Sequence, residues 1–187
     1  MLLIGDHFPC RHETGSNNYQ HCLLSKSGDY LLFVTMTETD RILEQLKRSF
    51  YKEAWHGLAY LEILDGVTAE QASKHPIKNA HSIWEIVTHT TTWIEAVRTR
   101  CLGKEFKVSD EQDWPVVTEI SDAAWQQTII DLKDQHKQLE DLVNSLKPED
   151  LNKSAAGSTM PNCSMLDSII HHNIYHSAQI AILKKLV

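Results

Sequence analysis

The sequence contains no long apolar run, no signal peptide and no closely spaced cysteine pair. No stretch reaches the roughly 18 consecutive apolar residues that a membrane-spanning helix needs. Asp6, His7 and Pro9 interrupt the short apolar start, which therefore does not resemble a secretory signal. The 4 cysteines lie far apart, and this predicts free thiols in a reducing compartment, not a disulfide framework or a cysteine zinc site. We therefore expect a cytoplasmic protein with no membrane partner.

The sequence also lacks clustered basic residues and the common nucleotide-binding and protease motifs. It has 18 Lys and Arg against 25 Asp and Glu, a formal net charge of −7. Binding to a nucleic-acid backbone needs grouped positive charge, so we expect no nucleic-acid partner. There is no HExxH, no P-loop and no G-x-G-x-x-G. With 187 residues, 42% of them hydrophobic, the chain has the composition of an ordinary globular protein.

The pattern of apolar residues changes near residue 36. Residues 1–35 show no 3.6-residue period, and their one apolar run, at 30–35, could form a strand. Long amphipathic stretches begin at Thr37. We therefore predict an N-terminal extension over residues 1–35, loosely attached, and one folded domain over residues 36–187. Met36 could be the true start of translation, and the alternative is an ordinary N-terminal subdomain.

Four amphipathic helices are predicted in the folded domain, which makes it an all-α four-helix bundle. Their expected ranges are 37–64, 82–102, 121–147 and 164 to nearly the C-terminus. Ser82 and Glu85 match a capping box at the start of the second helix. Gly57 lies inside the first helix and weakens that prediction. The long connection at 103–120 leaves the order of up and down helices open.

Histidines on the last predicted helix carry the clearest chemical signal. One stripe, at steps of three and four residues, consists of Ile169, His172, His176, Ile180 and Leu183. Two imidazoles one turn apart on a core-facing stripe can converge on one metal ion. His89, between Ile86 and Trp93 on the second helix, could supply a third ligand and leave a coordination position open. The alternative is a set of core histidines that hydrogen-bond other protein groups.

Other residues have weaker claims to the site. Glu85 could be an outer partner of a ligand, although its capping role explains its position better. Gln179 could contact a ligand imidazole or only make a hydrogen bond within the bundle. Trp55 and His56 could line a pocket, and Tyr175 could belong to a dimer surface.

Two segments resemble the motifs of the DinB/YfiT-like family. The segment 172–180, HNIYHSAQI, is similar to that family's last helix, and 82–89, SIWEIVTH, is similar to its second-helix motif. Ala178 stands where the family commonly has Gly. The resemblance covers about residues 37–187. It implies an up-down-down-up four-helix bundle, usually a homodimer, with one divalent ion, often zinc or nickel, held by His89, His172 and His176.

The resemblance implies several activities. Some family members look like metal-dependent hydrolases, and others like transferases that join a low-molecular-weight thiol, such as bacillithiol or mycothiol, to an electrophile. The first hypothesis is therefore a metal-dependent enzyme acting on a small-molecule substrate. The alternatives are a non-catalytic or stress-related metal-binding module, whose ion has a fourth protein ligand, and a metal-free interaction bundle with a polar histidine network.

Overall fold

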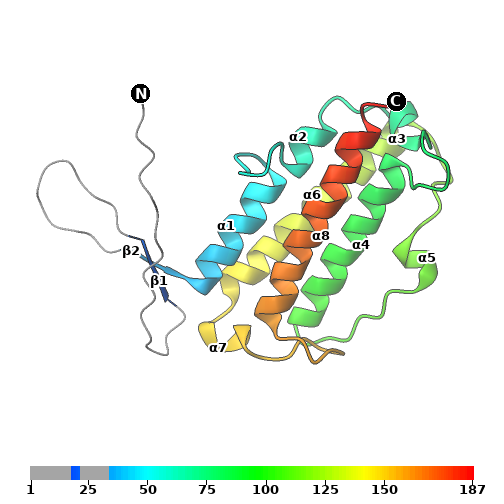
Figure 1. Ribbon diagram of the computed structural model, residues 1–187. Coiled ribbons are helices and arrows are strands. Elements are labelled where there is room, and N and C mark those ends of the chain that lie inside the picture. Colours follow the sequence, from blue (N-terminus) through cyan, green and yellow to red (C-terminus); the bar gives the residue numbers. More distant parts are fainter. Residues whose placement is uncertain (1–17, 22–33) are drawn as a thin grey trace, which may run out of the picture.

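The computed structural model describes residues 18–21 and 34–187, which form a short hairpin-like pair of strands and an all-α bundle (Figure 1). Strand β1 (Asn18–His21) pairs antiparallel with β2 (Val34–Thr37), with Asn18 opposite Thr37. Most of the predicted extension, including residues 30–33 of its apolar run, lies outside the described residues. The division at residue 36 stays a prediction.

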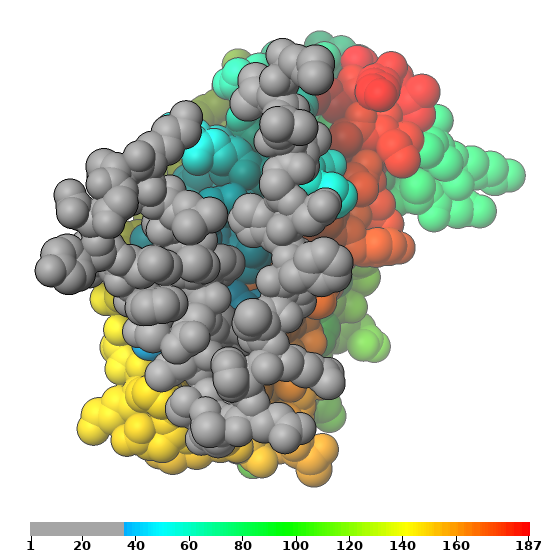
Figure 2. Space-filling model, turned by 60° about the vertical axis from the view of Figure 1, so that its left-hand side comes forward, coloured from blue at the N-terminus to red at the C-terminus, as the bar shows by residue number. Residues whose placement is uncertain are grey.

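Four long helices build the bundle: α1 (Glu38–Phe50), α4 (Ile83–Cys101), α6 (Asp122–Ser145) and α8 (Asn162–Leu183). In Figure 1, α1 and α8 run upward while α4 and α6 run downward, so the order is up-down-down-up. Helices α1 and α4 each contact both α6 and α8. Figure 2 shows α8, in orange and red, between α1 and α4. The predicted all-α four-helix bundle is confirmed.

Short helices occupy the connections between the long ones. They are α2 (Tyr60–Leu64), α3 (Ala69–Ser73), α5 (Asp110–Asp113) and α7 (Pro148–Leu151). Helix α5 interrupts the connection predicted at 103–120 and packs against α4. Among the helices of the described residues, none combines the length and apolarity that a bilayer crossing requires.

The predicted single helix over 37–64 is wrong. Helix α1 ends at Phe50, and the chain turns through Glu53 (φ 64°) and Gly57 (φ 131°) before α2 begins. The side chain of Trp55, which was a candidate for lining a pocket, is fully exposed. The fully buried Tyr60 donates a hydrogen bond to the hydroxyl of Thr90 at 3.0 Å, which fixes α2 against α4. The apolar residues that extended the predicted helix, Leu61 and Leu64, belong to the separate short helix α2.

The other three predicted helices are close to the observed ones. Helix α4 starts after Ser82, whose hydroxyl accepts from the amide of Glu85 at 3.2 Å while the carboxylate of Glu85 accepts from the amide of Ser82 at 2.7 Å. This is the predicted capping box. Helix α8 starts at Asn162, two residues before the predicted Ser164. The side chain of Asn162 donates to the carbonyl of Asp150 at 3.0 Å and so joins the start of α8 to α7.

The turn at Gly57 gives a test of the broken helix. If α1 continued to residue 64, the substitution Gly57→Ala would raise the free energy of unfolding by about 1 kcal/mol through helix propensity. At φ 131° a Cβ atom is strained, although no neighbouring atom lies within 4 Å of it. We therefore expect Gly57→Ala to lower the free energy of unfolding by about 1–2 kcal/mol, as measured by urea denaturation. A more stable variant would contradict the observed turn.

Candidate metal centre

Three histidines meet where α4 packs against α8. His89 comes from α4, and His172 and His176 come from α8, one turn apart. One potential ligand atom of each lies within 4.8 Å of the other two. His89 and His176 are buried and His172 is half-buried. The structure thus brings together the three residues that the sequence singled out, and within the described part of the chain no other His, Cys, Asp or Glu joins them.

The distances between these rings suit a shared ion. The Nε2 atoms of His89 and His172 are 3.1 Å apart. Two nitrogens on one tetrahedral zinc ion, each about 2.0–2.1 Å from the metal, would be about 3.3 Å apart. The ring centre of His176 lies 4.7 Å from that of His89 and 4.4 Å from that of His172. The separation of the two Nε2 atoms is therefore close to that of two ligands on one ion.

The protonation of His89 is set by Asp113, at the end of α5. The ring Nδ1 of His89 donates to the backbone carbonyl of Asp113 at 2.7 Å and lies 3.1 Å from its carboxylate. A carbonyl oxygen only accepts, so Nδ1 carries the hydrogen. In the neutral ring Nε2 then has the free lone pair, and this atom faces His172.

A tryptophan of α4 holds Asp113 in this position. The indole Nε1 of Trp93 donates to the carboxylate of Asp113 at 2.6 Å. Trp93 and His89 are four residues apart and therefore lie on the same side of α4. One helix thus supplies both the candidate ligand and the donor that positions the group behind it.

The two histidines of α8 have different surroundings. The ring Nδ1 of His176 donates to the side-chain oxygen of Gln179 at 2.7 Å, so its Nε2 is also free for a ligand. The Nδ1 of His172 is buried and has no hydrogen-bond partner among the described residues. The side-chain amide of the neighbouring Asn173 is also buried, and neither its nitrogen nor its oxygen has a hydrogen-bond partner among the described residues. His172 is therefore the least constrained of the three rings.

Burial keeps all three imidazoles neutral. It lowers the pKa of His89 and of His176, and it lowers the pKa of His172 to about 4, helped there by the charges that its two neighbours would carry. Asp113 and Gln179 oppose these shifts only in part. Neutral imidazole is the form that binds a metal. The donor set therefore fits a transition-metal ion.

An aromatic stack covers one face of His89. The indole of Trp114 lies parallel to the His89 ring with 3.9 Å between centres, and His81 stacks on Trp114 at 3.5 Å. Trp114 follows α5 directly, so the connection between α4 and α6 supplies both the acceptor and the cover of His89. No sequence pattern pointed to this role of Asp113, because its shorter contact with His89 is through its backbone carbonyl and the two residues are far apart along the chain.

Two of the weaker candidates lie away from the histidines, and two have clear partners. Trp55 and His56 are exposed on the turn after α1. The Glu85 carboxylate caps α4 and also contacts Nε2 of His75 at 2.9 Å, so the capping prediction describes it correctly. Gln179 contacts His176, a candidate ligand, which agrees with the first of the two expectations for this residue.

Comparison with known proteins assigns the chain to a family. A family model described as the DinB superfamily matches residues 51–180, more than two thirds of the chain. The match includes all three histidines of the candidate centre. Neither the curated proteins nor the solved structures contain a match. The fold, the histidine cluster and the family match agree, and the chain belongs to the DinB superfamily.

Proposed function

We propose that the protein holds one divalent transition-metal ion, zinc or nickel, on His89, His172 and His176, and that it is a metal-dependent enzyme. The observation that supports this most directly is the convergence of three neutral imidazoles from two helices. Two of them have their Nδ1 hydrogens engaged by Asp113 and Gln179, which leaves the Nε2 lone pairs for an ion. Such outer partners are typical of metal-binding histidines.

The composition of the cluster favours a catalytic ion over a structural one. Structural zinc sites have four protein ligands, whereas catalytic sites keep one position open. In residues 18–21 and 34–187 the group of potential ligands stops at three histidines. A bound ion would supply Lewis acidity that promotes ionisation of a water or a thiol. The protein's own contribution is to fix three ligands and to cover His89 with the ring of Trp114.

The reaction we propose is transfer of a low-molecular-weight thiol to an electrophile, with hydrolysis of a small molecule as the alternative. In the transfer, a bond forms between the thiol sulfur and an electrophilic carbon, the leaving group departs with its electron pair, and the thiol proton passes to solvent. Both reactions need an ionised nucleophile, and the open position would provide it. The resemblance to family members with these activities supports the choice.

The location and the assembly belong to the same proposal. A reducing, cytoplasmic location agrees with Cys101 and Cys163, both free thiols.

A homodimer is expected from the family resemblance. Three exposed apolar residues at compatible helical spacing follow the outer side of the last helix and its end: Tyr175, Ile182 and Leu186. Light scattering should give about twice the chain mass of 21.4 kDa, and the mass of a single chain would exclude the dimer.

The metal content of tag-free protein tests the site directly. We expect about one transition-metal ion per chain in the wild type by elemental analysis, and almost none in the double variant His172→Ala, His176→Ala. His171→Ala is the matched control, because this neighbouring histidine is exposed and lies outside the cluster. It should keep the metal. Wild-type protein that contains no metal and takes up none on reconstitution would overturn the proposal.

Removal of the metal distinguishes a catalytic ion from a structural one. The apolar core extends through all four long helices, and the anchors of His89 and His176 are protein groups. We therefore expect the chelated protein to keep its helical circular dichroism and a cooperative thermal transition, at a lower midpoint because ligand binding stabilises the native state. Unfolding on chelation at 25 °C would instead support the metal-binding module without an enzymatic role.

The hydrogen bond between Trp93 and Asp113 should influence metal affinity. Asp113→Ala and Trp93→Phe each remove it, and we expect each to weaken metal binding about 10- to 100-fold, as measured by competition with a chelating dye. Because both changes remove one interaction, the double variant should be little worse than the more severe single variant. Asp110→Ala in the same short helix is the control and should bind normally. Fully additive losses would show that the two residues act separately.

A further inference from the structure

Arg100, in the last turn of α4, is held in place by protein contacts and has no acidic partner among residues 18–21 and 34–187. Its Cζ lies 5.6 Å from the ring centre of Trp93, over the face of the indole, and its Nε donates to the carbonyl of Phe106 at 2.9 Å. The side chain is half-buried. Two contacts from different segments therefore fix the guanidinium before any ligand arrives.

The terminal nitrogens of Arg100 are unused. Within the described part of the chain they make no hydrogen bond, and no carboxylate lies at ion-pair distance. By contrast, Arg41 pairs with Glu38 and Asp167, and Arg48 pairs with Glu44. In a chain with 25 acidic and 18 basic residues, a fixed and unpaired guanidinium is a site prepared for an anion.

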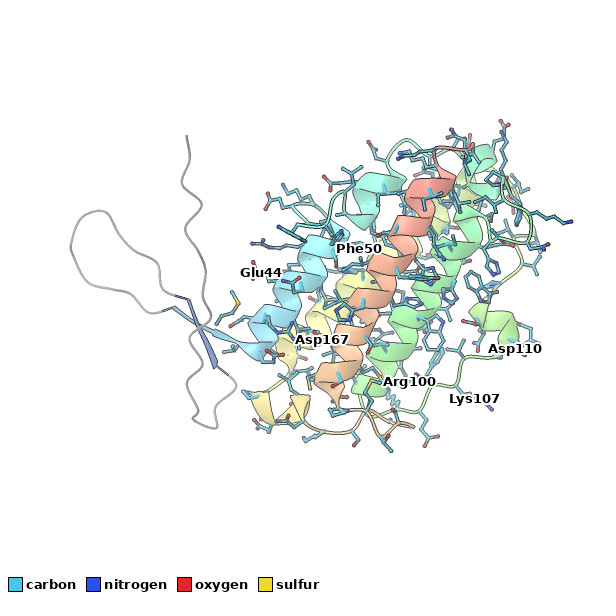
Figure 3. The ribbon with its side chains drawn as sticks, viewed as in Figure 1. Glu44, Phe50, Arg100, Lys107, Asp110 and Asp167 are labelled. Atoms are coloured by element: carbon cyan, nitrogen blue, oxygen red, sulfur yellow. The ribbon has the colours of Figure 1, made fainter. Side chains whose placement is uncertain are left out.

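Trp93 connects this cation to the histidine cluster. The ring centre of Trp93 lies 6.1 Å from that of His172 and 6.3 Å from that of His89. Together with the contact between Arg100 and the indole, this places the guanidinium within about 12 Å of the His172 ring. Figure 3 labels Arg100 towards the C-terminal end of α4, and Lys107 on the segment that leads to α5.

We propose that Arg100 and Trp93 form a subsite for a carboxylate of the substrate whose reacting group lies at the three histidines. This inference rests on the proposed function and names its substrate class: a small molecule with a carboxylate roughly 8–12 Å from the reacting atom, a span of about six to nine bonds. The two terminal nitrogens of the guanidinium match the two oxygens of a carboxylate. The indole of Trp93 is half-exposed and offers apolar surface to the linking atoms.

The charge of the protein favours a carboxylate over a phosphate. One guanidinium balances one negative charge, whereas a phosphate monoester carries close to two at neutral pH. The chain has a net charge of −7, and Asp113 lies next to Trp93, so excess negative charge would be repelled. A monoanionic group is the better match.

Two thiol probes that differ at one end test the subsite. Mercaptohexanoate and mercaptohexanol have the same chain length and the same thiol, but only the first has a carboxylate. We expect metal-loaded wild-type protein to bind mercaptohexanoate about tenfold more tightly in calorimetry, the scale of one hydrogen bond to a charged group. Arg100→Gln should abolish this preference and leave the affinity for mercaptohexanol unchanged.

Two further variants separate the role of Arg100 from general charge and from folding. Lys107→Gln makes the same change in net charge at an exposed position nearby, and it should keep the tenfold preference. Arg100→Lys keeps the charge and should keep part of the preference, with circular dichroism confirming that both Arg100 variants are folded. Equal binding of the two probes by the wild type, or an unchanged preference in Arg100→Gln, would overturn the subsite. Failure of both probes to bind the metal-loaded protein would instead count against the proposed binding of a thiol at the metal.

Discussion

Three imidazole rings packed together in a protein interior must each find a partner for one N–H and one lone pair. The N–H of His89 goes to Asp113 and that of His176 goes to Gln179, so both Nε2 lone pairs are directed away from these anchors. Burial lowers the pKa of each ring and opposes a positive charge on any of them. Lone pairs facing one another repel unless a proton or a cation lies between them. A proton between His89 and His172 would serve that pair alone, whereas a divalent ion would satisfy all three lone pairs at once, so the cluster is compatible with metal binding.

The same requirement links parts of the chain that are distant in sequence. Asp113 can accept from His89 only if α5 lies against α4, and the hydrogen bond from Trp93 together with the stacked ring of Trp114 keeps it there. The connection between α4 and α6 is thus part of the site, not only a link between helices. The indole of Trp93 also contacts Arg100, so one side chain positions both Asp113, the hydrogen-bond partner of a candidate ligand, and the proposed carboxylate subsite.

Local rules predicted the parts of this structure that depend on residues close in sequence. The Ser82 and Glu85 capping box and the one-turn spacing of His172 and His176 are of this kind, and both are observed. The break after Phe50 was missed because periodicity records spacing but not the direction of the helix axis. The role of Asp113 could not be read either, since any residue has a backbone carbonyl and only the fold brings this one to His89.

A fourth buried histidine shows why spacing alone does not define a metal site. On α6, His136 is fully buried, and its Nδ1 contacts the carboxylate of Glu140, four residues on, at 2.9 Å. Its ring stacks on Phe50 at 3.6 Å, so the bundle core surrounds the pair. On α8 the same four-residue step joins His172 to a second imidazole instead of an acid. Glu140 accepts the Nδ1 hydrogen of His136 within one helix, and the Nε2 of His136 has no hydrogen-bond partner among the described residues. On α8 the residue four positions after His172 is a second neutral imidazole, which offers no negative charge. The pair of His172 and His176 therefore still needs a cation or a hydrogen-bond donor. Helix α4 adds a third imidazole, that of His89, at the same place, so three lone pairs could share one cation.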